Sequence, residues 1–84
     1  MTEFTFSKHA KDQMLLRDIT MEEALETLNN ADSVIKLDDE QYIYQKLLGS
    51  DSYNKFLIRI FVNGKINPRL IKTIYRTSKI NKYY

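Results

Sequence analysis

The sequence feature that most constrains the fold is a change of hydrophobic period after Asn30. Up to that residue, apolar side chains recur at the spacing of amphipathic helices. Beyond it they alternate with polar side chains, which is the period of a strand with one buried face. Helices followed by strands predict an α+β fold. We expect two N-terminal helices packed on an antiparallel sheet of about four strands, in the order ααββββ, with residues 1–84 forming one domain.

Both predicted helices carry start signals. The first covers residues 8–17, and Ser7 precedes it as an N-cap whose hydroxyl can accept from a free backbone N–H group. The second covers residues 21–29, and Thr20 with Glu23 forms the capping-box pattern at its start. The side chains expected to form the buried stripe of the second helix are Met21, Ala24, Leu25 and Leu28.

Four strands are expected after Asn30, over residues 33–37, 41–48, 56–62 and 70–77. The third has apolar side chains on both faces, which is typical of a central strand. In the last strand, strict alternation places Ile71 and Tyr75 on one face, and it places Ile74 and Arg76 on the other. The N-terminal residues 4–6 leave two alternatives open, a short leading strand or a hydrophobic lead-in to the first helix.

Several kinds of site are disfavoured by residues that the sequence lacks. It has no cysteine, which excludes disulfides, thiolate metal sites and cysteine nucleophiles. It has one histidine, His9, and no carboxylate cluster at metal-ligand spacing, so we expect no metal and no cofactor. No apolar run approaches the roughly 18 residues of a membrane span, and the first residues do not resemble a signal peptide. We therefore expect a cytoplasmic protein without membrane contacts.

The charges are divided unevenly along the chain. The net charge of +2 says little by itself. From Thr20 to Ser52 acids outnumber bases, whereas from Tyr53 to Tyr84 there is no acid at all. The basic residues of this second half are Lys55, Arg59, Lys65, Arg69, Lys72, Arg76, Lys79 and Lys82. A basic half of this kind favours a nucleic-acid partner.

The last stretch of the chain mixes cations with aromatic rings. Besides its cations, the residues that we expect to contact a substrate there are Tyr75, Ser78, Lys82 and Tyr83. Cations can bind phosphate groups and tyrosine rings can stack on bases, so the combination indicates a nucleic-acid partner. The plainer alternative is a C-terminal strand followed by a solvated basic tail.

Two motifs, one near each end of the chain, resemble a known bacterial family. The first is Ser7-Lys-His9-Ala10-x-x-x-Met14-x-x-Arg17-x-Ile19-Thr20-x-Glu22-Glu23, and the second is Thr73-x-Tyr75-Arg76-Thr77-Ser78-Lys79-Ile80-x-Lys82-Tyr83. Together they resemble the domain-of-unknown-function 4258 family, which opens with a His-Ala, Arg-Met, Arg-Gly-Ile helix and closes on a Tyr-Arg, Lys-x-x-Lys-Tyr strand. Gln13 stands where that family usually has Arg, and Asp18 stands where it often has Gly.

That family in turn is similar to the BrnT and RelE group of small toxins, which cleave RNA without a metal. The resemblance implies a RelE-like or BrnT-like fold and a metal-independent endoribonuclease toxin, made beside a small antitoxin protein. The residues that match the family motif and would form the catalytic set are His9, Arg17, Arg76 and Lys79.

The chemistry of RNA cleavage fits these residue types. Attack by the ribose 2′-OH needs a base, an acid and cations around the phosphate as charge builds on it. His9 supplies an imidazole that can act as acid or base. Arg17 and Arg76 can bind a phosphate in bidentate fashion. If the first helix packs across the end of the last strand, we expect these side chains to surround one phosphate together with Lys79.

The same residues have non-catalytic readings. A histidine near a helix start often only packs its ring or caps a loop, and cations at a strand end are often just solvated. The protein would then be a binding module that holds RNA or DNA without cleaving it. A third alternative is a regulatory or immunity protein whose basic face binds an acidic chain. The residues alone do not decide whether the protein is an enzyme.

Overall fold

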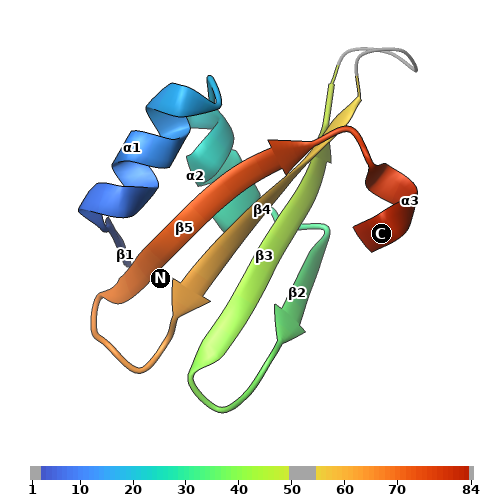
Figure 1. The fold of residues 1–84 in the computed structure, drawn as a ribbon. Coiled ribbons are helices and arrows are strands. Elements are labelled where there is room, and N and C mark those ends of the chain that lie inside the picture. The colour runs from blue at the N-terminus through green and yellow to red at the C-terminus, as the bar shows by residue number, and fades with distance from the viewer. Residues whose placement is uncertain (1–2, 50–54, 84) are drawn as a thin grey trace.

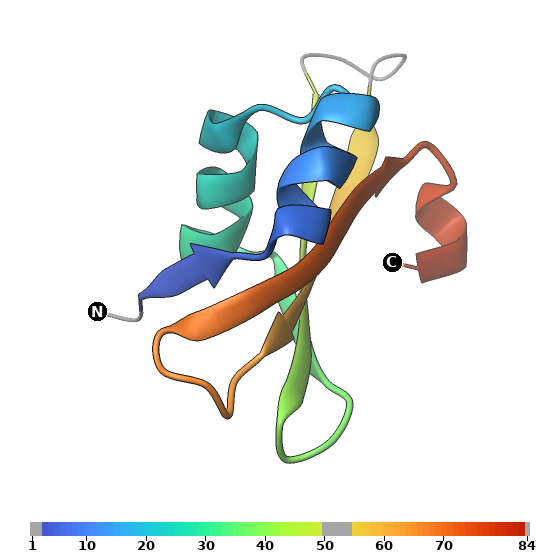
Figure 2. The same ribbon diagram turned by 60° about the vertical axis from the view of Figure 1, so that its left-hand side comes forward.

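The computed structural model describes residues 3–49 and 55–83. Its elements follow in the order β1 (Phe4–Phe6), α1 (Lys8–Leu16), α2 (Met21–Asn29), β2 (Ser33–Lys36), β3 (Gln41–Leu48), β4 (Phe56–Asn63), β5 (Arg69–Thr77) and α3 (Ile80–Tyr83). The predicted α+β class is confirmed. α1 and α2 lie on one side of the sheet, and α3 lies on the other side (Figure 1, Figure 2).

The sheet is mixed and has five strands, in the order β1-β5-β4-β3-β2. β1 pairs in parallel with residues 69–71 of β5, whereas the other neighbouring strands are antiparallel. The predicted antiparallel sheet of about four strands is wrong in this respect, because the first residues add a parallel edge strand. A segment of three residues carries little local signal, and it becomes a strand only where the folded chain supplies a partner.

Both predicted helix caps are confirmed. The Ser7 hydroxyl accepts a hydrogen bond from the Ala10 N–H at 3.0 Å. The Thr20 hydroxyl accepts from the Glu23 N–H at 3.1 Å, and the Glu23 carboxylate accepts from the Thr20 N–H at 3.0 Å. This reciprocal pair is a complete capping box, and it fixes where α2 begins.

α1 ends in a left-handed turn at Asp18, whose φ is 55°. The Asp18 N–H donates to the Leu15 carbonyl at 3.4 Å, and the Ile19 N–H donates to the Met14 carbonyl at 2.9 Å. This pair of bonds is the Schellman motif, in which the left-handed position usually belongs to glycine. Asp18 therefore occupies a backbone conformation that glycine adopts without strain.

The buried stripe of α2 differs from the predicted one. Met21 and Leu25 are 46% and 42% exposed, so the prediction that they are buried is wrong. The buried side chains of α2 are Ala24, Thr27 and Leu28. α2 packs on β3 and β4 through this narrower stripe, and Thr27 satisfies its hydroxyl by donating to the Glu23 carbonyl at 2.9 Å. Met21 and Leu25 lie on the flank of the helix and remain partly open to solvent.

The main core lies between the sheet and the two N-terminal helices. Its buried residues are Ala10, Met14, Ile19, Ala24, Leu28, Tyr44, Ile58, Ile60, Val62, Ile71 and Ile74. β4 is the middle strand, as its sequence predicts, and it is buried on both faces: Ile58 and Ile60 face the helices, while Leu57 and Arg59 face the other way. Burial of these aliphatic side chains is the main stabilising term, at about 25 cal/mol per Å² of apolar surface.

An irregularity in β5 changes which of its side chains share a face. Ile60 of β4 pairs with Ile74, but Val62 pairs with Ile71, so the register shifts by one residue between them. Ile71 and Ile74 are consequently both buried in the main core, although strict alternation predicted opposite faces. That prediction is wrong because a β-bulge inserts one unpaired residue into the strand. From Thr73 to Thr77 the alternation is regular again.

The end of the chain also departs from the predicted tail. After β5 the backbone turns into the short helix α3, which sequence analysis did not anticipate. α3 lies against the face of the sheet turned away from α1 and α2, which we call the far face (Figure 2). Its anchor is a hydrogen bond of 3.2 Å from the Gln45 side-chain N–H to the Tyr83 carbonyl. Among the described residues, no helix is long and apolar enough to cross a membrane.

Candidate functional site

A row of polar side chains crosses the far face of the sheet. Gln45 of β3 lies opposite Arg59 of β4, and Arg59 lies opposite Tyr75 of β5. Directly opposed residues on neighbouring strands point to the same face, so the three side chains lie next to one another. Together with Arg17 and Tyr83 they form what we call the far-face cluster.

Arg59 is the centre of this cluster. Its Nε donates to Gln45 Oε1 at 3.1 Å, and one of its Nη atoms donates to the Tyr75 hydroxyl at 2.7 Å. Its guanidinium lies 4.3 Å from the centroid of the Tyr83 ring, within cation–π distance. Only 9% of Arg59 is exposed, yet no carboxylate of residues 3–49 and 55–83 forms an ion pair with it. A largely buried cation whose partners among the described residues are all neutral favours the approach of an anion.

Tyr75 joins the cluster to the end of α1. The Arg17 guanidinium lies 5.9 Å from the centroid of the Tyr75 ring. Arg17 is held in place by its own helix, because its Nε donates to Gln13 Oε1 at 2.9 Å. The Phe61 ring stacks on the Tyr75 ring, with the two ring centroids 6.0 Å apart. Arg17, which is exposed, therefore adds a second cation at the rim.

Tyr83 is brought to the cluster by α3. Its ring packs edge-on against Tyr75, with centroids 6.4 Å apart, and its side chain is only half-buried. Burial raises the pKa of the Tyr83 hydroxyl, but the charge of Lys82, hydrogen bonds with Tyr75 and Lys82, and the charge of Arg59 lower it more. The pKa of Tyr83 consequently lies below its ordinary value of 10.0.

These side chains can perform three tasks that RNA chemistry needs. Arg17 and Arg59 supply positive charge for a phosphate. The Tyr75 and Tyr83 rings offer surfaces on which bases can stack. The Tyr83 hydroxyl, with its lowered pKa, is suited to exchange a proton.

Two members of the predicted catalytic set, Arg17 and Arg76, make different contacts where the end of α1 meets β5. Arg76 follows Tyr75 along the strand and points to the side of the N-terminal helices, where it pairs across the sheet with Ile58. One of its Nη atoms donates to the Asp18 carbonyl at 3.3 Å, and its guanidinium lies 4.0 Å from the centroid of the Phe56 ring. Arg17 instead contacts Tyr75 of the far-face cluster. Arg76 thus links β5 to the end of α1 rather than joining Arg17.

His9 and Lys79 are both exposed. Within the described part of the chain, His9 makes no side-chain hydrogen bond or ion pair. It lies about 12 Å along the axis of α1 from Arg17, since eight residues rise 1.5 Å each. Within the described ranges, Lys79 makes backbone hydrogen bonds only: its N–H donates to the Thr77 hydroxyl at 3.0 Å, and its carbonyl accepts from the Lys82 N–H at 3.3 Å. Within the part of the chain that the structure describes, no hydrogen bond, ion pair or ring contact joins the four predicted catalytic residues to one another, so their shared role stays a prediction.

The predicted substrate-contacting residues divide in a similar way. Tyr75 and Tyr83 belong to the far-face cluster, and Lys82 lies beside it with its Nζ 5.4 Å from the centroid of the Tyr83 ring. Ser78 is exposed in the turn before α3, where its carbonyl accepts from the Ile80 N–H at 2.9 Å. These assignments remain predictions, but three of the four residues lie together.

Arg59 and Gln45 were not predicted as members of a site. The sequence does contain a signal for Arg59, because this single cation interrupts the most apolar strand of the chain. Its meaning depends on register, since only the paired strands show that Gln45 and Tyr75 flank Arg59.

Comparison with known protein families assigns this chain to one of them. A family model described as Domain of unknown function (DUF4258) matches residues 6–76. The chain belongs to the DUF4258 family. This match ends at Arg76, so Ser78, Lys79 and α3 of this DUF4258 protein lie beyond it. None of the curated proteins and none of the solved structures matches the chain. The proposed relation to the BrnT and RelE toxins therefore stays a prediction.

Proposed function

We propose that this DUF4258 protein is a metal-independent endoribonuclease of the toxin type, and that the far-face cluster is its RNA site. The observation that carries the proposal is the row of Gln45, Arg59 and Tyr75, in which a largely buried cation has no carboxylate partner among the described residues. Arg17 and Tyr83 complete the site from two helices that lie on opposite sides of the sheet.

The roles follow from position and chemistry. Arg17, at the exposed rim, and Arg59, behind the tyrosine rings, hold the phosphate and stabilise the charge that develops on it. Tyr83 accepts the proton of the attacking ribose 2′-OH, because its lowered pKa makes the phenolate more accessible. The attack forms a 2′,3′-cyclic phosphate and breaks the bond between phosphorus and the 5′ oxygen, which takes a proton from solvent water and leaves as a hydroxyl. Tyr83 returns the proton that it accepted to the hydroxide formed in the solvent. Tyr75 supplies a stacking surface for a base.

A second candidate function is RNA binding without cleavage. The observation in its favour is that His9, the only imidazole of the chain, makes no contact with the far-face cluster within the described residues. A cluster of two arginines and two tyrosines is sufficient for binding a phosphate and stacking a base. Whether the protein cleaves the RNA that it binds distinguishes the two candidate functions.

The decisive experiment measures binding and cleavage of the same single-stranded RNA in the presence of EDTA. Binding is followed by fluorescence anisotropy, and cleavage by gel electrophoresis. We expect Tyr83→Phe to keep its affinity within about twofold while its cleavage rate falls about 100-fold, as for the loss of a general base. We expect Arg59→Met to weaken binding about tenfold, the effect of losing one charge-assisted contact.

Arg69 provides a matched control. Like Arg59 it donates to a tyrosine hydroxyl, that of Tyr44 at 2.8 Å, and lies 5.1 Å from a second ring, that of Tyr42. It packs on the helix side of the sheet, so Arg69→Met should leave RNA affinity unchanged. Binding without cleavage by the unaltered protein would select the second candidate. Equal losses in Arg59→Met and Arg69→Met would show that the far-face cluster is not the RNA site.

The toxin role has a separate test in cells. We expect induced expression to arrest growth, and we expect co-expression of the small protein encoded beside it to restore growth. Tyr83→Phe should grow normally under the same induction. Arrest by a Tyr83→Phe protein that no longer cleaves RNA would contradict the toxin mechanism.

A further inference from the structure

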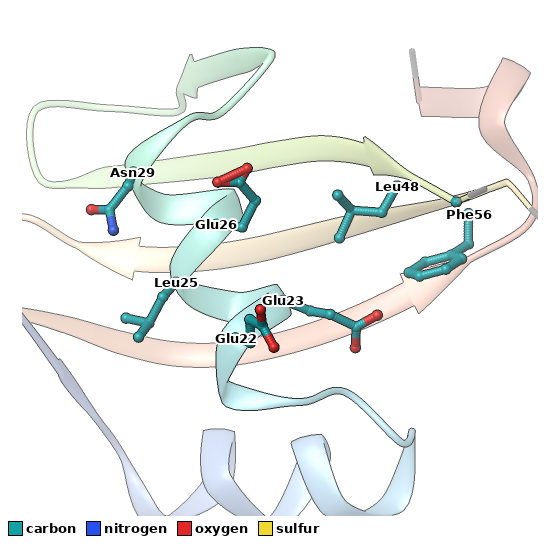
Figure 3. A pocket seen from close by; sticks show the side chains of 8 residues that line it. Glu22, Glu23, Leu25, Glu26, Asn29, Leu48 and Phe56 are labelled. Atoms are coloured by element: carbon teal, nitrogen blue, oxygen red, sulfur yellow. The ribbon is translucent and has the colours of Figure 1, made fainter.

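A groove opens on the side of the sheet opposite to the far-face cluster. It has a volume of about 640 Å³ and runs between α2 and the adjoining ends of β3 and β4 (Figure 3). Its lining residues are Glu22, Glu23, Leu25, Glu26, Asn29, Leu48, Gly49 and Phe56. A volume of this size holds several side chains of a partner.

Among the described residues, the lining of the groove has three carboxylates and no basic side chain. Glu23 Oε1 accepts from the Thr20 N–H at 3.0 Å, and Glu26 Oε1 accepts from the Asn30 side chain at 2.6 Å. Glu22 makes no side-chain hydrogen bond or ion pair within the described residues. None of the three takes part in an ion pair in the described ranges, although the chain has more bases than acids. Their negative charge is therefore left for an outside partner.

Apolar side chains lie between and beside these carboxylates. Figure 3 shows Leu48 and Phe56 along one side of the groove, facing Glu23 and Glu26 of α2. Both are half-buried, and Leu25 on the flank of α2 is 42% exposed. Phe56 already takes the Arg76 guanidinium against its ring at 4.0 Å. The groove thus combines apolar contact surface with a rim that attracts cations.

We propose that this groove is a docking site for a basic amphipathic segment of a partner protein. The partner segment would place one or two aliphatic side chains beside Leu48 and Phe56, and its Lys or Arg side chains beside Glu22 and Glu26. Charge complementarity selects this occupant. A nucleic acid would be repelled by the carboxylates, and two copies meeting groove to groove would bring the same acids together.

The groove is independent of the proposed RNA site. Leu48 and Phe56 belong to the side of the sheet that packs on α1 and α2, whereas Arg59 belongs to the far face. A partner seated in the groove leaves Tyr83 and the cluster uncovered. The two proposals can therefore fail separately.

The test uses a fluorescein-labelled synthetic helical peptide with leucine at helical spacing and lysine elsewhere. Two comparison peptides replace lysine by glutamate, or keep the composition and scramble the leucine positions. We expect the first peptide to bind more tightly than both. In NMR spectra of the isotope-labelled protein, we expect binding of the first peptide to shift the amide signals of Leu25, Glu26 and Phe56.

Variants then separate the groove from the overall charge of the protein. We expect Glu22→Gln with Glu26→Gln to weaken peptide binding about three- to tenfold, the effect of losing two exposed ion pairs. The matched control is Glu3→Gln with Asp39→Asn, which removes the same charge from residues outside the groove and should change affinity less than about twofold. Leu25→Ser should weaken binding without changing the charge.

Three outcomes would overturn the proposal. Equal losses in the groove variant and its matched control would show attraction by net charge alone. Equal binding of the scrambled peptide, or amide shifts confined to Arg59 and Tyr75, would place the peptide elsewhere. Self-association of the protein that the groove variant abolishes would make a second copy the occupant. RNA affinity should be unchanged in the groove variant whatever the peptide result, so the peptide assay leaves the RNA site untouched.

Discussion

The strand β4 contributes different kinds of side chain to the two faces of the sheet. On the helix side, β4 contributes Ile58 and Ile60 to a core of aliphatic side chains, and their burial stabilises the fold without directional bonds. On the far face, the residue between them, Arg59, is nearly as buried but is held by two directed hydrogen bonds and a ring contact. The difference indicates that the helix side maintains the fold, and it is the reason why we place the proposed RNA site on the far face.

The largest effect is expected from breaking the helix side. Ile60 is fully buried between its strand neighbours and the helices. Ile60→Ala removes buried methyl groups and leaves a cavity, so we expect the free energy of unfolding to fall by about 3 kcal/mol. Urea denaturation followed by circular dichroism measures this loss.

Arg59, which precedes Ile60 in β4 but points to the far face, provides a second test of the difference between the two faces. Arg59→Met keeps much of the apolar volume but leaves Gln45 Oε1 and the Tyr75 hydroxyl without their donor. We expect it to cost about 1 kcal/mol, clearly less than Ile60→Ala, because replacing Arg also removes a desolvated charge. A larger loss from Arg59→Met than from Ile60→Ala would reverse the assignment of the two faces.

The cap of α2 ranks next, since it positions one of the helices that cover the core. Thr20→Ala removes the hydroxyl that accepts from the Glu23 N–H. We expect the free energy of unfolding to fall by about 1 kcal/mol and the melting temperature to fall with it. Thr5→Ala, in an exposed position of β1, serves as the control for the loss of a threonine hydroxyl. An unchanged melt for Thr20→Ala would mean that the cap adds nothing.

A smaller gain is expected at the end of α1. Asp18 adopts a left-handed backbone conformation that glycine adopts without strain, and it gives only its carbonyl to Arg76. Asp18→Gly should therefore raise the free energy of unfolding by about 0.5 kcal/mol while keeping the contact to Arg76. The contrasting variant is Asp12→Gly inside α1, which should cost about 0.5 kcal/mol through the lower helix propensity of glycine and the loss of the ion pair with Lys8. Destabilisation by both glycines would show that Asp18 is not strained.

The smallest effect concerns the far face and depends on pH. Because the folded state lowers the pKa of Tyr83 below 10.0, the fold favours the phenolate. Stability from this group is therefore gained as pH rises through the folded pKa, is complete above the ordinary value, and is lost as pH falls. At each pH, the urea midpoint of unfolding is measured for the unaltered protein and for Tyr83→Phe. We expect the midpoint of the unaltered protein to rise relative to that of Tyr83→Phe as the pH becomes alkaline. A difference that shrinks as pH rises would mean that the pKa of Tyr83 is raised instead.

The candidate site could be predicted from the sequence only in part. Tyr75, Arg17 and Tyr83 were expected to contact RNA on the basis of motifs, and the structure brings them into one cluster. Arg76 was expected to act together with Arg17, and this shared role stays a prediction. Arg76 follows Tyr75 along β5, and neighbouring residues of a strand point to opposite faces. Arg59 was overlooked because a single arginine in an apolar strand acquires its partners only from pairing with β3 and β5.

The sequence by itself determined the local features of this protein. The change of period after Asn30 determined the α+β class, and Ser7 and Thr20 determined where the helices begin, because these signals act over a few residues. Only the tertiary structure decided the parallel strand β1, the shift of register in β5 and the position of α3 on the far face. Each of these depends on contacts between residues far apart in the chain, and the row of Gln45, Arg59 and Tyr75 exists for the same reason.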